Sequence, residues 1–363
     1  MVIAGLHVGL VGPLPPPYGG MANQTRQLAE LLRGEGLTVS FVCTNEKYRP
    51  HWVAKLPVIR AVFRLFPYLI ALWRAAGRCH VIHVMANSGW SWHLFAMPAI
   101  WISRLRRTPV IVNYHGGEAE SFLRKTTRFV LLTMRQSSTL IVPSGFLKAV
   151  FGRFGMQATI VANVVDLGLF SRTKPRSSSR HHFLVARNLE PIYDNETAIR
   201  AFASVRRQIP DVTLTIAGSG PLAEQLQALT VALGISGAVF FTGRLDREMM
   251  AEAYRKADIA LNPSLVDNMP ISVMEALASG LPVISTNVGG IPFILKHEQT
   301  ALLVPPGSPD AMADAMIRLM TDTALSDKLI DNGLAAVKNY TWEKVWPALA
   351  EVYRDAIDER SLA

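Results

Sequence analysis

The sequence predicts an α/β protein made of two doubly wound domains, and three observations support this prediction. Short runs of Val, Ile and Leu alternate with longer amphipathic segments over nearly the whole chain. The apolar runs show little polar alternation, which is typical of strands buried on both faces of a parallel sheet. The alternation breaks at residues 166–182, where Ser, Pro and basic residues follow no period. We therefore place one domain at residues 1–170 and another at 180–341, which suits a chain of 363 residues.

Each domain is expected to consist of strands that lead into helices. In the first domain, the strand "LHVGLVG" at 6–12 precedes a helix that closes with glycine near residue 36. Its further strands are expected at 37–44, 81–86, 109–116 and 139–144. The strands of the second domain are expected at 182–187, 212–220, 238–243, 259–264 and 282–286, with helices at 194–208, at 221–233, from 246 and from 270.

The positive charge is concentrated in the first half of the chain. Residues 1–179 contain 21 of the 37 Lys and Arg residues but 6 of the 28 Asp and Glu residues. The second half is acidic, so the net charge of +9 is not a general solubilising charge. We expect the first half to face an anionic partner.

Cysteine content and hydropathy indicate the compartment. Two cysteines, Cys43 and Cys79, are too few for a disulfide framework, which fits a reducing environment. The N-terminus lacks the charged start and long apolar run of a signal peptide. The most apolar segment, residues 65–73, is shorter than the roughly 20 residues of a membrane helix and contains Pro67. We therefore expect a cytoplasmic protein.

Four turns lie where ligands of parallel sheets bind, beyond the carboxyl ends of strands. Gly19 and Gly20 precede the first helix and would let a phosphate or sugar oxygen approach the backbone. His115 could donate to a sugar hydroxyl or a developing charge, and Arg187 could neutralise a phosphate leaving group. Gly218 lies in a G-x-G turn, which is weak evidence alone. A plain turn, a structural histidine and a surface arginine are the alternatives.

The segment 264–286 carries the most specific pattern. Pro270 suits the first turn of a helix, whose leading N–H groups lack intrahelical partners and can bind an anion. The side chain of Glu275 points back toward the helix start, where it could hydrogen-bond to a ribose. Asp267, in the preceding loop, faces the same opening. The amide donors would be those of Met269, Ile271 and Ser272. The alternative is that Asp267 caps the helix and Glu275 is solvated.

Together these residues resemble glycosyltransferase family 4, whose members are retaining enzymes of the GT-B fold, with two Rossmann-like domains facing a central cleft. The resemblance rests on Asp267 and Glu275, which are separated by seven residues, and on the following "EALASGLPVISTNVGGIPF". The Gly19-Gly20 loop, "HG", "PSG", "NVVDLGLF", "AGSGP" and "NPS" fall in the family's order. The C-terminal segment, about residues 342–363, resembles the family's last helix, which packs back on the first domain.

The resemblance implies that a sugar is transferred from a nucleotide diphosphate sugar with retention of configuration, without a metal or other cofactor. The donor would bind mainly to the second domain and the acceptor to the first. Arg187 would stabilise the leaving diphosphate, His115 would contact the transferred sugar, and Glu275 would hold the ribose. Asp267 would join His115 and Arg187 as a catalytic residue, and the remaining donor contacts would come from Gly19, Gly20, Gly218, Met269, Pro270, Ile271 and Ser272.

Three positions depart from the family pattern. A Lys that joins the Arg on the diphosphate in many members falls near Tyr193 or Asp194 in this chain. Asp267 is one methylene shorter than the usual Glu, and Phe293 replaces the last Glu of the motif. These changes bear on donor affinity and identity more than on catalysis.

The basic first half suggests where the acceptor lies. Residues 53–76 combine large apolar side chains with Lys55, Arg60, Arg64 and Arg74. A basic amphipathic segment too short to span a bilayer is typical of one that lies on it, and each basic residue near anionic lipid adds about 1 kcal/mol. We expect peripheral association with the inner face of the cell membrane and a saccharide or lipid-linked acceptor. The alternative is that much of 53–76 is an ordinary core helix.

Other functions fit the sequence less well. A nucleic-acid partner would explain the charge but not the pairing of Asp267 with Glu275 at a helix start. A nicotinamide dehydrogenase would need a G-x-G-x-x-G after the first strand, and "GLVGPLPPPYGG" does not supply it. A GT-B nucleotide-sugar epimerase or phosphorylase and a non-catalytic sugar-nucleotide-binding protein remain as alternatives.

Overall fold

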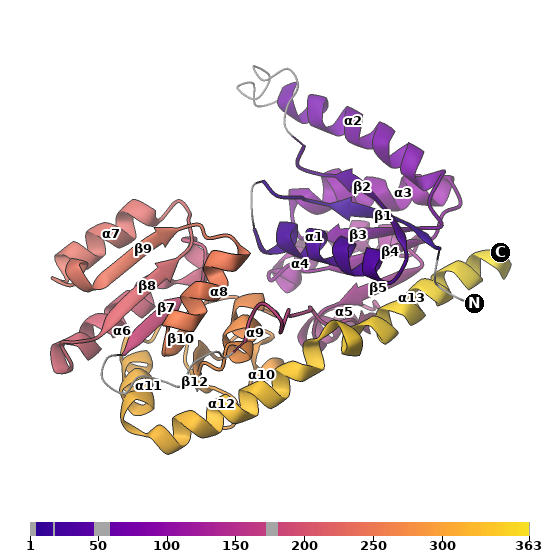
Figure 1. Ribbon diagram of the computed structural model, residues 1–363. Helices are drawn as coiled ribbons and strands as arrows, with labels where there is room; N and C mark the ends of the chain where they lie inside the picture. The colour runs from indigo at the N-terminus through magenta and orange to yellow at the C-terminus, as the bar shows by residue number, and fades with distance from the viewer. Residues whose placement is uncertain (1–4, 17–18, 47–58, 172–180, 363) are drawn as a thin grey trace. The chain divides into compact units, whose positions relative to one another are not determined.

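The structure is a computed structural model that describes residues 5–16, 19–46, 59–171 and 181–362. The chain forms two compact units, one of Met1–Asn163 with Val345–Ala363 and one of Val164–Lys344. Each unit contains a six-stranded sheet whose neighbouring strands are parallel (Figure 1). The predicted α/β class with two doubly wound sheets is confirmed.

The first sheet has the strand order β2-β1-β3-β4-β5-β6. Its strands are β1 (His7–Gly12), β2 (Thr38–Cys43), β3 (Val81–Ala86), β4 (Val110–Tyr114), β5 (Thr139–Val142) and β6 (Thr159–Ile160). Its helices are α1 (Gly20–Gly34), α2 (Ile59–Ala76), α3 (Met97–Leu105), α4 (Ala119–Met134), α5 (Gly145–Arg153) and α13 (Trp342–Leu362), and the π-helical turn η2 (Trp92–Ala96) precedes α3. Strands β3 and β4 are buried along their whole length, which explains their Val- and Ile-rich sequences.

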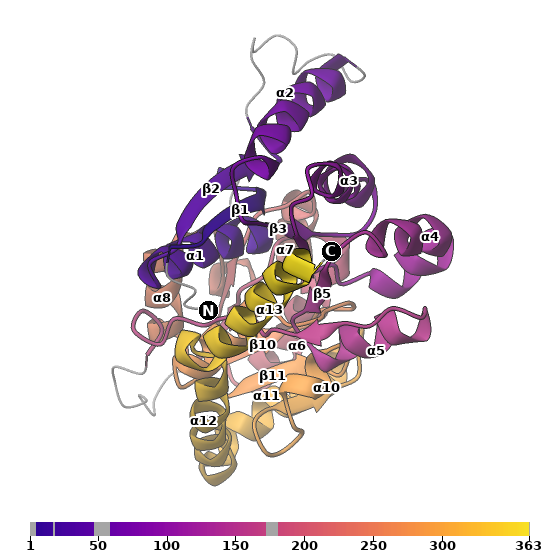
Figure 2. The same cartoon turned by 90° about the vertical axis from the view of Figure 1, so that its right-hand side faces the viewer.

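Helix α13 brings the end of the chain into the first unit (Figure 2). The buried hydroxyl of Tyr353 lies 2.9 Å from Nδ1 of His83, and Nε2 of His83 lies 3.1 Å from Nδ2 of Asn113. Burial lowers the pKa of His83 to about 3, so its ring is neutral. The neutral ring accepts from the Asn113 amide and donates to the Tyr353 oxygen. This buried polar chain fixes α13 against β3 and β4.

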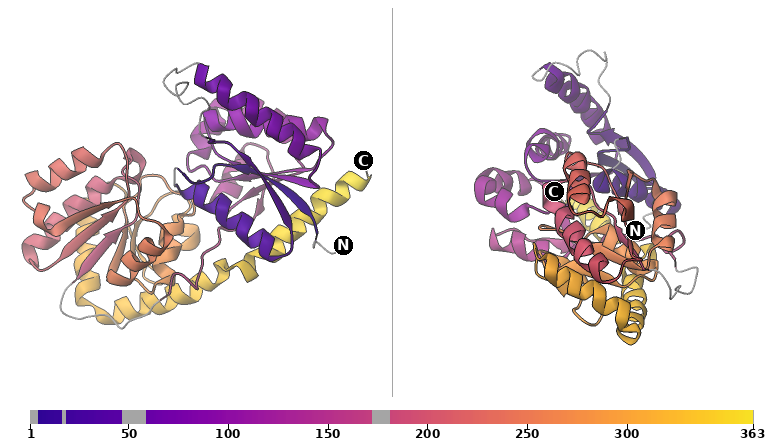
Figure 3. Two further views of the ribbon diagram at one scale, coloured as in Figure 1. Left: turned by 45° about the horizontal axis from the view of Figure 1, so that its top comes forward. Right: turned by 90° about the vertical axis from the view of Figure 1, so that its left-hand side faces the viewer.

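The second sheet has the strand order β12-β11-β10-β7-β8-β9. Its strands are β7 (His182–Val185), β8 (Thr213–Ala217), β9 (Val239–Gly243), β10 (Ile259–Asn262), β11 (Val283–Thr286) and β12 (Leu302–Val304). Its helices are α6 (Asn195–Gln208), α7 (Ala223–Ala232), α8 (Arg247–Lys256), α9 (Ile271–Ala278), α10 (Ile291–Ile294), α11 (Pro309–Thr321) and α12 (Thr323–Val337), with short 3₁₀ turns at η3 (Pro191–Tyr193), η4 (Ser236–Ala238) and η5 (Lys338–Tyr340). Helices lie on both faces of each sheet (Figure 3).

The strand order of the second sheet reverses between β7 and β10. Strand β8 continues the sheet on the far side of β7, and β11 continues it on the far side of β10. The chain therefore leaves the carboxyl ends of β7 and β10 in different directions, and such a switch point is where doubly wound sheets bind ligands. Arg187 follows β7, and Asp267 follows β10.

The structure also shows elements that the sequence analysis did not anticipate. Strands β6 and β12 have two and three residues, too few for a recognisable apolar run. The expected linker at 166–182 is described in part, because residues 172–180 lie outside the described residues. Within the described residues, no helix has the length and apolar character needed to cross a bilayer.

Candidate active site

Arg187 lies at the switch point of the second sheet and is held from two sides. Its side chain is 11% exposed and forms an ion pair with the carboxylate of Asp267. Its Nε donates to Oδ1 of Asn262 at 2.8 Å. The guanidinium is therefore fixed in orientation before any ligand arrives, which is the property expected of a group that stabilises a leaving anion. The structure thus brings the predicted residues Arg187 and Asp267 together.

Asn262, which the sequence analysis missed, is oriented by its own hydrogen bonds. Its Nδ2 donates to Oγ of Ser285 at 2.9 Å, and its Oδ1 accepts from Oγ of Ser264 at 2.9 Å. These three side chains are buried, since their exposed fractions are 3% or less. Because the amide nitrogen is committed to Ser285, the amide oxygen points toward Arg187. The "NPS" motif therefore supplies a turn and also Asn262, whose amide oxygen orients the Arg187 guanidinium.

Helix α9 begins directly after this network. Pro270 is its N-cap, with φ −68° and ψ 121°, and no side chain caps the helix start. The first N–H groups of an α-helix have no partner four residues back, so those of Ile271 and Ser272 can bind an anion or sugar oxygen. Asp267 does not cap the helix, because its Oδ1 accepts from the N–H of Asn268 at 3.0 Å and its other oxygen pairs with Arg187. Met269 is buried beside the helix start.

Glu275 lies one turn into α9 and is partly buried. Desolvation raises the pKa of its carboxyl to about 7, against smaller lowering effects of the Tyr254 hydroxyl and of Arg247 and Arg187. Oε2 of Glu275 lies 3.2 Å from the Tyr254 hydroxyl. A carboxylate in this position can accept two hydrogen bonds from a vicinal diol such as that of a ribose.

Glycines bring the loops of the second unit close to Arg187 and Asp267. A Cβ on Gly218 would overlap the carbonyl of Arg187, and a Cβ on Gly289 or Gly290 would overlap the carbonyl of Asp267 or Asn268. The N–H of Gly290 donates to the carbonyl of Asp267 at 3.0 Å. Gly218 therefore serves the packing of the β8–α7 turn against Arg187, a role that the sequence analysis did not assign to it.

The predicted residues of the first unit also lie at carboxyl ends of strands. His115 follows β4, and its buried Nε2 has no hydrogen-bond partner among the described residues. Burial lowers the pKa of His115 to about 4, so its ring is neutral at pH 7 and can donate or accept. Gly19 is the N-cap of α1 and Gly20 its first residue, and a Cβ on either would meet open space.

Two family models match the chain along most of its length. The model described as Glycosyl transferases group 1 matches residues 170–335, and the model described as Glycosyltransferase Family 4 matches residues 18–169. This chain belongs to glycosyltransferase family 4. The family assignment and the α/β architecture agree, and the chain is a glycosyltransferase.

Curated relatives of this family 4 glycosyltransferase include two mannosyltransferases named for phosphatidylinositol. Phosphatidyl-myo-inositol mannosyltransferase of Mycobacterium leprae is 24% identical over 370 residues, which cover 96% of each chain. GDP-mannose-dependent alpha-(1-6)-phosphatidylinositol monomannoside mannosyltransferase of Mycobacterium tuberculosis is 30% identical over 191 residues, 51% of this chain and 49% of the relative. An uncharacterised glycosyltransferase of Methanocaldococcus jannaschii is 30% identical over 164 residues, 45% of this chain and 42% of the relative.

Solved structures confirm the GT-B fold of this family member. Sucrose-phosphate synthase from Thermosynechococcus elongatus aligns with a TM-score of 0.77 at 22% identity, covering 98% of this chain and 100% of the other. Anabaena HepE, solved with UDP and glucose, aligns with a TM-score of 0.75 at 17% identity, covering 95% and 98%.

The sequence analysis expected the family's lysine position near Tyr193 or Asp194, and the structure places the ring of Tyr193 beside Arg187. Asp194 adopts a left-handed conformation, with φ 41°, and its carboxylate caps α6 by accepting from the N–H of Thr197 at 3.4 Å; it also accepts from Oγ1 of Thr197 at 2.6 Å. Tyr193 instead faces the site, with its ring centroid 5.0 Å from Cζ of Arg187. A ring stacked on the guanidinium restricts its motion through a cation–π contact but adds no charge. Phe293, on α10, is 52% exposed.

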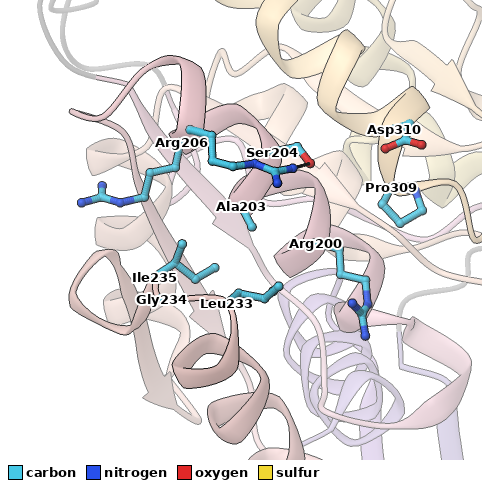
Figure 4. A pocket seen from close by; sticks show the side chains of 10 residues that line it. Arg200, Ala203, Ser204, Arg206, Leu233, Gly234, Ile235, Pro309 and Asp310 are labelled. Carbon is cyan, nitrogen blue, oxygen red and sulfur yellow. Dashed lines mark hydrogen bonds between the residues drawn. The ribbon is translucent and has the colours of Figure 1, made fainter.

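The second unit also contains a cavity that is not lined by Arg187, Asp267 or Glu275. It has a volume of about 420 Å³ and is lined from α6, the loop after α7 and the start of α11 (Figure 4). Helix α6 begins at the carboxyl edge of the sheet and runs back toward the opposite edge. The cavity is lined by Arg206 and Arg207 near the C-terminus of α6, so it lies at that opposite edge. Arg206 donates to the carbonyls of Pro210 and Val212 at 2.7 Å, so it serves the local fold.

The described residues offer no group of three or more His, Cys, Asp or Glu side chains that could hold a metal ion.

Proposed function

We propose that this glycosyltransferase moves a hexose from a nucleoside diphosphate sugar to a saccharide or lipid-linked acceptor, with retention of the anomeric configuration and without a metal cofactor. The observation that carries the proposal is the arrangement at the switch point, where Arg187, the start of α9 and Glu275 lie at one edge of the sheet. The similarity to mycobacterial mannosyltransferases named for phosphatidylinositol favours a lipid-linked acceptor.

In the proposed reaction, the bond between sugar C1 and the diphosphate oxygen breaks. The acceptor oxygen bonds to C1 on the same face, and its proton passes to a phosphate oxygen of the leaving group. Negative charge therefore grows on the diphosphate, where Arg187 and the first amides of α9 stabilise it more strongly than in the ground state. Glu275 holds the ribose, and neutral His115 hydrogen-bonds a hydroxyl of the transferred sugar. The acceptor binds to the first unit.

Replacing Glu275 with alanine tests donor binding. Hydrogen bonds to a charged group contribute about 1.5–3 kcal/mol, so affinity for UDP or GDP should fall on the order of 10- to 100-fold. Isothermal titration and nucleotide-dependent melting shifts measure the loss. Glu252→Ala is the matched control, because Glu252 is an exposed carboxylate on α8 that pairs with Arg255 and Lys256. Equal affinity of Glu275→Ala and wild type would contradict the ribose role.

Product analysis separates transfer from the two alternatives. A transferase releases nucleoside diphosphate only together with a glycosylated acceptor. An epimerase changes the sugar nucleotide with no acceptor present, and a binding protein leaves it intact. Activity that persists in excess EDTA would support transfer without a metal, and activity restored only by a divalent cation would contradict it.

The proposed membrane contact rests on an outward stripe of α2. Phe63, Phe66, Ile70 and Trp73 follow a 3-4-3 spacing and are exposed, although they are large and apolar. The opposite face, with Tyr68 and Leu72 among others, packs into the core, so α2 is apolar on both faces. The predicted basic amphipathic segment also includes residues 53–58, with Lys55, and the side chain of Arg60. These lie outside the described residues.

Exposed basic residues surround this stripe. Arg74 and Arg78 follow it, Arg104 lies in the last turn of the neighbouring helix α3, and Arg106 and Arg107 come directly after that helix. The guanidinium of Arg106 lies 4.8 Å from the ring centroid of Trp73. Large apolar side chains rimmed by arginines fit the interface of an anionic bilayer. We propose that this surface docks the enzyme on the inner face of the cell membrane.

Introducing negative charge into the stripe tests the docking. The double variant Phe66→Asp/Trp73→Asp should bind phosphatidylglycerol-containing vesicles at least about ten-fold more weakly than wild type, because it loses apolar burial and repels the anionic surface. Vesicle flotation at low and high salt measures binding. Phe240→Asp alters a comparably exposed aromatic residue in the second unit and should leave flotation unchanged. Flotation that is equal with neutral and anionic vesicles at low salt would contradict the proposal.

A further inference from the structure

Tyr254 links helix α8 to the start of α9. Its hydroxyl lies 2.9 Å from the carbonyl oxygen of Ser272 and 3.2 Å from Oε2 of Glu275. Among the described residues, no other side chain or backbone group is within hydrogen-bond distance of the Glu275 carboxylate. One phenol hydroxyl therefore contacts both the first turn of α9 and the carboxylate that leans toward it.

The ring of Tyr254 is fixed by its surroundings. It is 1% exposed, and Phe170 packs edge-on against it with ring centroids 5.8 Å apart. The cavity between Tyr254 and the strands β7 and β10 measures about 10 Å³, no more than the space of one water. Burial and the nearby carboxylate raise the pKa of Tyr254 well above its usual range, so the hydroxyl keeps its proton and shares it between the Ser272 carbonyl and the Glu275 carboxylate.

We propose that Tyr254 is a positioning residue of the donor site, which holds the Glu275 carboxylate and the first turn of α9 in the orientation that receives the ribose of a nucleoside diphosphate. This inference rests on the proposed function, because it assigns the ligand of Glu275 as a ribose. A hydrogen bond from a neutral donor favours the ionised form of a carboxylate. Tyr254 therefore also sets the pH range in which Glu275 is available as an acceptor.

The charges that act on Glu275 come from two arginines. Arg247, at the start of α8, and Arg187, after β7, both favour its ionised form. Arg247 pairs with Asp166 at 3.1 Å, and Arg187 with Asp267, so each already serves another carboxylate. Tyr254 is thus the direct contact, and desolvation is the opposing influence that raises the pKa of Glu275 to about 7.

The pKa of Glu275 gives a specific pH dependence. An acid whose pKa is raised by folding binds its proton more tightly in the folded chain, so ionised Glu275 opposes folding at alkaline pH. A ribose that donates hydrogen bonds to the ionised carboxylate of Glu275 binds best in that same alkaline range. If only the ionised form binds, affinity should fall about ten-fold from pH 8 to pH 6.

The test uses Tyr254→Phe, which keeps the buried ring and removes the hydroxyl. Titration calorimetry with UDP and with GDP from pH 6 to pH 8.5 is expected to show two effects: affinity at pH 8 falls about ten-fold, and the pH at which affinity is half-lost moves upward. Glu275→Gln should bind weakly at every pH and melt at a higher temperature than wild type at pH 8 without ligand. Tyr340→Phe is the matched control, because it removes a half-buried phenol elsewhere in the second unit.

The possible outcomes are distinct. If Tyr254→Phe binds as wild type does, or loses affinity equally at every pH, the positioning role is overturned. If wild type binds neither nucleotide, the proposed function itself fails. The alkaline melting profiles of wild type, Tyr254→Phe and Glu275→Gln then still report whether the hydroxyl acts on the carboxylate. A profile of Tyr254→Phe identical to that of wild type would reject that contact.

Discussion

Replacing Arg187 with alanine is expected to lower kcat about 10²- to 10³-fold and to weaken nucleoside diphosphate binding far less. Charge accumulates on the diphosphate as the bond to the sugar breaks, so a fixed cation contributes most in the transition state. Arg187→Lys should be intermediate, because an ammonium keeps the charge but cannot satisfy Asn262 and Asp267 together with a phosphate. Initial rates at saturating donor, together with calorimetric Kd values, measure both effects.

Folding and catalysis must be separated in this experiment. Arg187→Ala leaves the Asp267 carboxylate buried without its cation, which costs on the order of 3–5 kcal/mol for a buried pair. The double variant Arg187→Gln/Asp267→Asn replaces the ion pair with a neutral contact and should recover stability while kcat stays low. Arg200→Ala, which removes an exposed arginine paired with Glu196, is the matched surface control. A double variant that regained kcat with stability would show that Arg187 has only a structural role.

Gly218→Ala is expected to impair both stability and donor binding. The added methyl group would overlap the carbonyl of Arg187, and backbone atoms on that side leave it no flexible neighbour to displace. Overpacking of this kind costs about 1–3 kcal/mol. Because the backbone that must move carries Arg187, nucleotide affinity should fall as well. Thermal unfolding and nucleotide titration of the same preparation detect the two losses.

Gly237→Ala provides the comparison for this variant. Gly237 lies in the short turn η4 of the same unit, and a Cβ there meets no atom within 4 Å. Its melting temperature should stay close to that of wild type. If Gly218→Ala were equally benign, the close packing of the β8–α7 turn against Arg187 would be wrong.

The fold could be predicted because its strands are locally encoded. Buried parallel strands such as β3 and β4 are unbroken Val- and Ile-rich runs, and helix α1 is followed by a recognisable glycine, Gly36. Strands β6 and β12 escaped detection because two or three residues carry no period, and their pairing depends on neighbours distant in sequence. The order of the strands likewise depends on tertiary packing.

The candidate site was predicted only in part, for a similar reason. Arg187 and Glu275 occupy motif positions after a strand and within a helix, so the sequence indicates them. Asn262 and Tyr254 act through partners 75 and 21 residues away, and a single sequence does not reveal such pairs. The sequence analysis named Tyr193 and Asp194 for the position of the family's lysine, but it did not foresee that the Tyr193 ring lies over the Arg187 guanidinium.

The buried chain from Asn113 through His83 to Tyr353 bears on the order of events during translation. Residues 164–344 are contiguous, so the second unit can mature once they have left the ribosome. The first unit emerges earlier, yet it must wait for the final twenty or so residues before His83 meets its partner. A released chain that ends before Tyr353 would therefore contain every residue of the second unit but lack part of the first unit.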